Sequence, residues 1–302
     1  MSSPDRAIDA RQPWSVTLAG YLTLARVSNS PTVVSNVLAG AALSGVTWLD
    51  ARIALLAGAL ALFYTAGMVL NDLCDYEWDR RQRPDRPLPA GIVSRRAAGI
   101  ATIVLFAAGC ALLWLVSLAA LASGVVLIAL IGLYDRWHKG NPLGPLVMAG
   151  CRLLVYVTAF VAFAWPLSQA LLLAGGLLVL YMVGLTAIAK SEIRPNPINY
   201  WPVALLFLPA VYFASVALIP LRAPDMLPLS LALLLAGWAA YSATFVYRRV
   251  GRDISAAVAG LIAGISLLDS VVMASAGARE SLAIALAAFG LTLFLQRYVE
   301  GT

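Results

Sequence analysis

The residues best suited to chemistry are acids and arginines that crowd into positions 71–91 of an otherwise apolar sequence. Asp72, Asp75 and Asp79 stand at i, i+3 and i+7, a spacing that predicts three carboxylates on one face of a helix. Like charges this close repel one another, so the spacing predicts a bound cation. Asn71 adds an amide oxygen, and hard oxygen ligands of this kind suit Mg²⁺. The alternative is a solvated helix end whose acids pair with nearby arginines.

Four arginines follow the acids directly and indicate an anion beside the cation. Prolines and a glycine at 84, 87, 89 and 91 predict a rigid, non-helical loop that holds Arg86 next to the acids. Guanidinium groups bind phosphate oxygens in a fork, so the whole stretch is typical of a diphosphate bound through magnesium. Without the acids, the same loop would be an ordinary basic loop. The four arginines are Arg80, Arg81, Arg83 and Arg86.

A second polar segment, 134–144, follows an apolar run and could take part in the same chemistry. Arg136 and Lys139 could neutralise phosphate, and Tyr134 could donate a hydrogen bond to it. His138, the one histidine of the chain, is expected to be an interfacial side chain rather than a base.

A third polar segment, 190–196, has a similar make-up. Glu192 could supply another metal oxygen, and Lys190 could supply another phosphate contact. A lone acid between Lys190 and Arg194 could equally be an ion pair, and the residue types do not decide between the two interpretations.

Charges inside apolar sequence are expensive, so three further residues stand out. Arg152 is expected to face the cavity that holds the acids. Arg26, early in the first apolar run, could bind substrate or extend to the membrane interface. Asp269 receives no assigned role beyond a helix-packing hydrogen bond.

The elements that must position these residues are membrane-spanning helices. The chain has 302 residues, 61% of them hydrophobic and 12% charged, and its mean hydropathy is +0.85. A soluble protein of this size carries about twice that share of charge. The polar N-terminus lacks the pattern of a cleavable signal peptide, and no linker divides the expected single domain, 1–302. Ten apolar runs are predicted to span the membrane, at 18–44, 51–71, 95–116, 118–134, 145–164, 168–189, 200–219, 228–247, 254–274 and 280–298.

The distribution of basic residues predicts the orientation of these spans. With a cytoplasmic N-terminus, 16 of the 21 lysines and arginines lie on the cytoplasmic side and 3 on the other. The acidic motif and the other polar segments then face the cytoplasm. The net charge of +6 reflects this bias, so we expect an integral cell-membrane protein and no nucleic-acid partner.

Four motifs together resemble the UbiA superfamily of intramembrane prenyltransferases. The resemblance extends over most of the first 200 residues, and the combination of the first two motifs is specific. The motifs are Asn71-Asp-x-x-Asp75-x-x-x-Asp79, Arg86-Pro-Leu-x-x-Gly91, Arg26-x-x-x-x-Pro31 and Tyr134-x-x-x-x-Lys139.

The resemblance implies an all-α bundle around a lateral, lipid-open cavity, capped by cytoplasmic loops that bind a prenyl diphosphate through Mg²⁺. Family members transfer the prenyl group to a small-molecule acceptor, usually an aromatic ring. Carried over position by position, the first metal set is Asn71, Asp72, Asp75 and Asp79. The diphosphate contacts implied in the same way are Arg86 and Lys139.

This sequence departs from the family in two ways. The second motif normally has paired aspartates, whereas the matching segment 190–196 offers Glu192 as its one carboxylate. The family typically has nine spans, and ten are predicted here. Two alternatives therefore stay open: a non-catalytic or transport protein on the same scaffold, and prenyl transfer to a non-aromatic acceptor such as a sugar or a glycerol phosphate.

Overall fold

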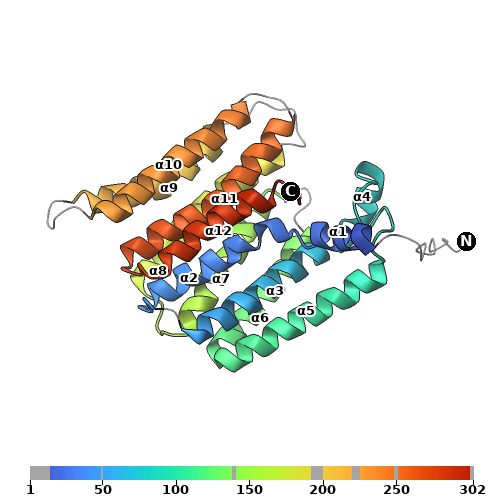
Figure 1. Ribbon diagram of the computed structural model, residues 1–302, viewed down its shortest axis with the longest axis horizontal. Helices are drawn as coiled ribbons and strands as arrows, with labels where there is room; N and C mark the ends of the chain where they lie inside the picture. Colours follow the sequence, from blue (N-terminus) through green and yellow to red (C-terminus); the bar gives the residue numbers. More distant parts are fainter. Residues whose placement is uncertain are drawn as a thin grey trace, which may run out of the picture.

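The computed structural model is a bundle of helices, shown in Figure 1. It describes residues 14–48, 50–137, 141–191, 200–219, 225–247 and 251–299, and these residues contain no β-strand. The helices are α1 (Trp14–Leu24), η1 (Val27–Asn29), α2 (Pro31–Leu43), α3 (Ala51–Cys74), α4 (Tyr76–Gln82), α5 (Arg95–Val116), α6 (Leu118–Trp137), α7 (Gly144–Val161), α8 (Gln169–Ser191), α9 (Tyr200–Ala217), α10 (Met226–Tyr247), α11 (Gly251–Ser275) and α12 (Leu282–Leu295).

The predicted all-α, multi-pass architecture is confirmed. Within the described residues, eight helices, α3 and α5 to α11, are long and apolar enough to cross a bilayer. They correspond to the eight inner runs predicted from the sequence. The last predicted span, 280–298, contains α12, which has 14 residues and is shorter than the roughly 20 residues that a straight span needs.

The first predicted span, 18–44, is not one continuous helix. It is divided into α1, η1 and α2, with α1 and α2 only 11 and 13 residues long. Arg26 adopts a left-handed conformation, with φ of 44°, which ends the helical path after α1. Pro31, which has no backbone N–H to donate, then begins α2.

The acidic motif also departs from the prediction, because its three aspartates do not share one helical face. The helix α3 ends at Cys74, and Asp75 stands between it and the short helix α4. Asp72 therefore belongs to α3 and Asp79 to α4, which projects from the end of the bundle in Figure 1. The spacing is compatible with a continuous helix, but the chain turns at its middle acid.

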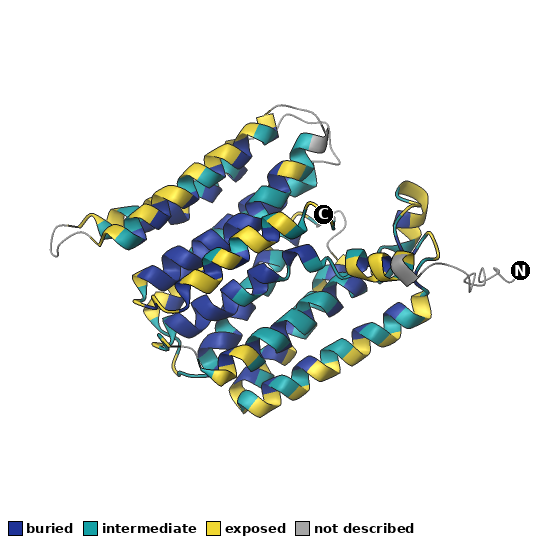
Figure 2. Cartoon of the chain, in the orientation of Figure 1, coloured by how far each residue is buried: buried dark blue, intermediate teal, exposed yellow. Residues whose placement is uncertain are grey.

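Burial separates an inner helix from outer ones (Figure 2). In α11, 83% of the apolar segment is buried inside the protein, whereas the corresponding share for α5 is 17%. The outward face of α5 carries large apolar side chains such as Ile103 and Trp114, which are 71% and 62% exposed. This pattern is that of an integral membrane protein, whose outer helices contact lipid.

The helices α2 and α7 approach each other closely at Gly40. A Cβ atom at this position would lie 2.6 Å from the Tyr156 carbonyl oxygen and 2.8 Å from the Ala159 Cβ. Close helix contact through small residues is typical of membrane bundles. It holds α2 against α7, and both helices carry side chains of the site described below.

We predict that Gly40→Ala lowers the stability of the protein by about 1–3 kcal/mol, because the helices must separate to admit the methyl group. Thermal unfolding in detergent would measure this. The matched control is Gly176→Ala in α8, where an added Cβ meets no atom within 4 Å. Equal unfolding temperatures for the two variants would contradict the close approach.

Candidate functional site

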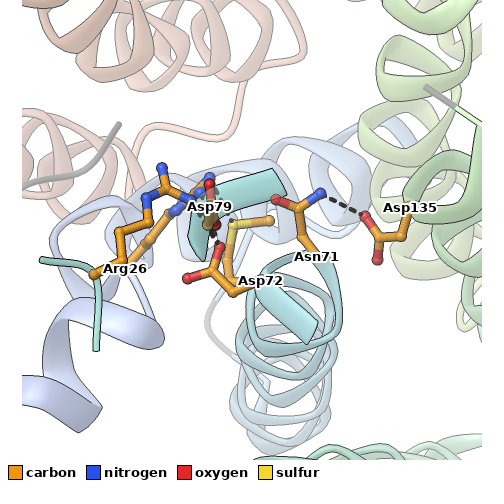
Figure 3. Close-up of polar contacts among 7 residues, drawn as sticks. Arg26, Asn71, Asp72, Asp79 and Asp135 are labelled. Atoms are coloured by element: carbon orange, nitrogen blue, oxygen red, sulfur yellow. Dashed lines mark hydrogen bonds and ion pairs between the residues drawn. The ribbon is translucent and has the colours of Figure 1, made fainter. Parts of the chain in front are cut away.

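The acidic motif forms two groups of polar contacts at the end of α3 (Figure 3). Neighbouring residues on a helix point about 100° apart, and accordingly Asn71 and Asp72 point in different directions. Asp72 lies with Asp79 among arginines, whereas Asn71 reaches Asp135 at the end of α6. We call this end of the bundle the motif end.

Arg86 links two buried carboxylates in the first group. Its Nη1 donates to Asp79 Oδ2 at 3.0 Å and to Asp72 Oδ1 at 3.3 Å, and Arg26 Nη2 donates to the same Asp72 oxygen at 3.4 Å. Asp72 is 6% exposed and Asp79 2% exposed, so each carboxylate depends on these arginines for compensation of its charge.

The loop that holds Arg86 has the predicted non-helical form. Residues 83–94 make turns between α4 and α5. The Ala90 N–H donates to the Arg86 carbonyl oxygen at 2.9 Å, and Gly91 has a φ of +74°, which glycine adopts without strain. The loop thus fixes the guanidinium over the acids.

Asn71 and Asp135 form the second group. Asn71 Nδ2 donates to Asp135 Oδ1 at 3.1 Å, and Asp135 is 5% exposed. The other oxygen, Oδ2, is buried and accepts no hydrogen bond from the described residues. No role was predicted for Asp135, although an acid at the end of an apolar span was a usable signal.

A cavity of about 320 Å³ opens between these groups and the interior of the bundle. Arg26, Arg83 and Arg86 line it at the motif end together with Tyr134 and Asp135. Arg152, which was expected to face the cavity that holds the acids, is among the residues that line it. The interior wall is largely apolar and aromatic, and includes Leu60, Phe63, Tyr64, Leu127, Val155 and Ile265.

Two other predicted residues, Arg136 and Lys190, are not among the residues that line this cavity. Arg136 is exposed on α6. Lys190 Nζ donates to the Asn141 carbonyl oxygen at 3.0 Å, so it joins the end of α8 to the segment before α7. Lys139 and Glu192 lie outside the described residues.

The side chains at the motif end include oxygen ligands that suit Mg²⁺, but they do not form a complete coordination sphere. The part of the chain that the structure describes contains no group of three or more acidic, histidine or cysteine side chains arranged to hold a metal ion. Arginines engage Asp72 and Asp79 instead. The unpartnered Asp135 oxygen and the adjoining Asn71 amide nevertheless fit a hard cation.

Comparison with solved structures finds the same fold. A structure described as a digeranylgeranylglyceryl phosphate synthase in membranes superimposes with a TM-score of 0.61 at 20% identity, covering 86% of this chain and 98% of that one. A UbiA homolog from Archaeoglobus fulgidus bound to DMAPP and Mg²⁺ gives a TM-score of 0.58 at 15% identity, covering 83% and 99% of the two chains.

Sequence relatives include digeranylgeranylglyceryl phosphate synthases of archaea. The Methanothermobacter thermautotrophicus protein is 29% identical over 180 residues, 58% of this chain and 53% of that protein. The Halobacterium salinarum protein is 30% identical over 191 residues, 62% of this chain and 61% of that protein. The likeness thus spans little more than half the length of these relatives. The sequence model of the UbiA prenyltransferase family matches residues 31–258, and the chain belongs to that family.

Proposed function

We propose that this protein transfers a prenyl group from a prenyl diphosphate to an acceptor inside the membrane, in a reaction that depends on Mg²⁺. The observation that carries the proposal is the cavity, which has a cluster of acids and arginines at one end and apolar walls beyond it. A prenyl diphosphate has the same two parts, because its anionic head suits the charged end and its apolar tail suits the apolar walls. Family membership supports the same reaction.

The metal would be held by Asn71, Asp72, Asp75 and Asp79, to which we add Asp135. The arginines that now engage Asp72 and Asp79 are the same groups that would bind the diphosphate. Binding of the phosphate oxygens by Arg86 and Arg26 would release these carboxylates for the cation. On this proposal, metal and diphosphate bind together and each prepares the site for the other.

Bound Mg²⁺ would supply Lewis acidity at the diphosphate oxygens. Arg86 and Arg26 would neutralise the negative charge that builds up as the carbon–oxygen bond breaks, and Tyr134 would hydrogen-bond the leaving group. Phe63 and Tyr64 belong to the interior wall that would surround the prenyl group. The apolar wall would exclude water, so that the acceptor captures the prenyl group and then loses a proton.

A further contact to the diphosphate is proposed for Lys139. Arg136, exposed near the end of α6, would add positive charge outside the cavity, and Lys190 would hold the backbone at Asn141. Glu192 would be the remaining carboxylate of the second motif. The orientation with the motif end in the cytoplasm also belongs to this proposal, because it rests on the distribution of basic residues.

The acceptor was expected to be aromatic, with a glycerol phosphate among the alternatives. The relatives favour a glycerol phosphate acceptor, because they are digeranylgeranylglyceryl phosphate synthases. A transport role is less well supported, since transporters spread charges through several spans, whereas 16 of the 21 lysines and arginines here are predicted to lie on one side of the membrane.

We predict that Asp72→Asn abolishes Mg²⁺-dependent release of diphosphate, because the variant loses a metal ligand and the charge that Arg26 and Arg86 compensate. Incubation of the purified protein with prenyl diphosphates of several lengths and candidate acceptors would measure release and transfer. Unchanged turnover, with normal membrane insertion, would refute the assignment of the site.

Asp135→Asn is predicted to weaken Mg²⁺-dependent binding of prenyl diphosphate by about tenfold, because it removes a ligand charge while preserving the side-chain shape. Binding of labelled substrate with and without a chelator would measure this apart from turnover. The matched control is Glu77→Gln, which neutralises an exposed acid on α4. If both variants bind as the wild type does, Asp135 is not a ligand.

A further inference from the structure

A second charged cluster lies in the interior of the bundle, on α2, α7 and α11. Asp269 of α11 is fully buried. Its carboxylate accepts hydrogen bonds from Ser35 Oγ, from Tyr156 Oη and, at 2.9 Å, from Asn36 Nδ2. These neutral donors come from the two helices packed around Gly40, and they satisfy both carboxylate oxygens.

Asn36 connects this carboxylate to an arginine. Its Oδ1 accepts from Arg152 Nη1 at 2.8 Å, while its Nδ2 donates to Asp269. Arg152 Nη2 donates to Thr32 Oγ1 at 3.0 Å. Within the described residues, both hydrogen-bond partners of the guanidinium are therefore neutral, and they engage two of its five N–H donors.

This arrangement differs from that of a simple structural ion pair. A buried arginine and a buried aspartate compensate each other best in direct, well-aligned contact. Here Asn36 is interposed, so the charge of Asp269 stabilises Arg152 from a distance and does not occupy its N–H groups. Arg152 is partly exposed as a residue, and it lines the cavity.

The position of Arg152 separates it from the diphosphate end of the cavity. Its guanidinium carbon lies 5.6 Å from the centre of the Tyr64 ring. Tyr64 precedes Asp72 by eight residues in α3, or about 12 Å along the helix axis. Arg152 therefore meets α3 about two helical turns deeper than Asp72 and about one turn deeper than Met68, whose sulfur Arg26 Nη1 contacts at 3.6 Å.

We infer that Arg152 forms a second anion-binding subsite, which takes the phosphate or carboxylate of the acceptor substrate. This inference rests on the proposed function and assigns the acceptor to an anionic class. Asn36 and Thr32 hold the guanidinium in place, and Asp269 anchors Asn36 as part of the packing of the bundle. An acceptor anchored here would extend its nucleophilic group toward the motif end, where the allylic carbon is exposed to it.

Equilibrium binding to the full-length protein in phosphatidylcholine nanodiscs tests the inference without turnover. The probes are an alkylglyceryl phosphate, 4-hydroxybenzoate and, as neutral counterparts, the alkylglycerol and phenol. Wild-type protein is expected to bind at least one anionic probe about tenfold more tightly than its neutral counterpart. The probe that shows the preference identifies a phosphate or a carboxylate as the ligand. Equal binding of each pair would overturn the inference.

Three variants separate anion binding from a purely structural role. Arg152→Gln is expected to lose the roughly tenfold tighter binding of the anionic probe, and Arg152→Lys is expected to keep part of it. In both variants, the affinity for prenyl diphosphate should change less than about twofold. Asp269→Asn is expected to lower the unfolding temperature and keep the preference. If Arg152→Gln retains the preference, or if Asp269→Asn and Arg152→Gln lose it equally, the charge of Arg152 serves only to compensate Asp269.

Diphosphate release by the wild type is measured in parallel. Absence of release with every prenyl diphosphate would refute the proposed function, whereas loss of the anion preference in Arg152→Gln would still establish the subsite. Normal release together with equal binding of anionic and neutral probes would refute the subsite alone. The two failures are therefore distinguishable.

Discussion

Charges inside an apolar bundle must be compensated by other protein groups, because water is scarce there, and the rest of this structure depends on that constraint. At the motif end, Arg86 compensates Asp72 and Asp79 directly. In the interior, Asp269 and Arg152 are compensated through an amide. The first arrangement joins the loop after α4 to the end of α3, and the second joins three helices. Both clusters contribute side chains to the wall of one cavity, so the same side chains serve the stability of the bundle and the candidate site.

Much of the fold could be predicted from the sequence, because eight long apolar runs each have one favourable structure in a bilayer. The interruptions were harder to predict. The acid spacing suits a continuous helix, and the turn at Asp75 is seen only once Asp79 is placed against Arg86. Asp135 lies 64 residues from Asn71, and no local pattern joins them. Asp269 likewise meets α2 across more than 230 residues of sequence. Local periodicity predicted the helices, whereas contacts between distant residues decide the site.

The contacts at the motif end explain how a chain with a weakened second motif could still bind an anionic substrate. The segment 190–196 offers fewer carboxylates than the family pattern, but Asp135 adds a buried one beside the first motif. It lies at the end of α6 and lines the same cavity as Arg86. The acids and arginines gathered at this end would hold a metal–diphosphate complex together, the metal by the carboxylates and the phosphate by the guanidinium groups.

The left-handed backbone at Arg26 has a consequence for which substitutions this position can accept. Glycine takes this conformation most readily and asparagine next, but neither carries the charge that reaches Asp72. Lysine keeps a charge and gives up the planar fork, and every long side chain bears the same backbone strain. Backbone and side chain therefore favour different residues at one position. Arginine meets the electrostatic requirement at a conformational cost. Position 26 should therefore tolerate neither small residues that relieve the backbone strain nor other long residues that keep it, and it should be among the least replaceable positions of the chain.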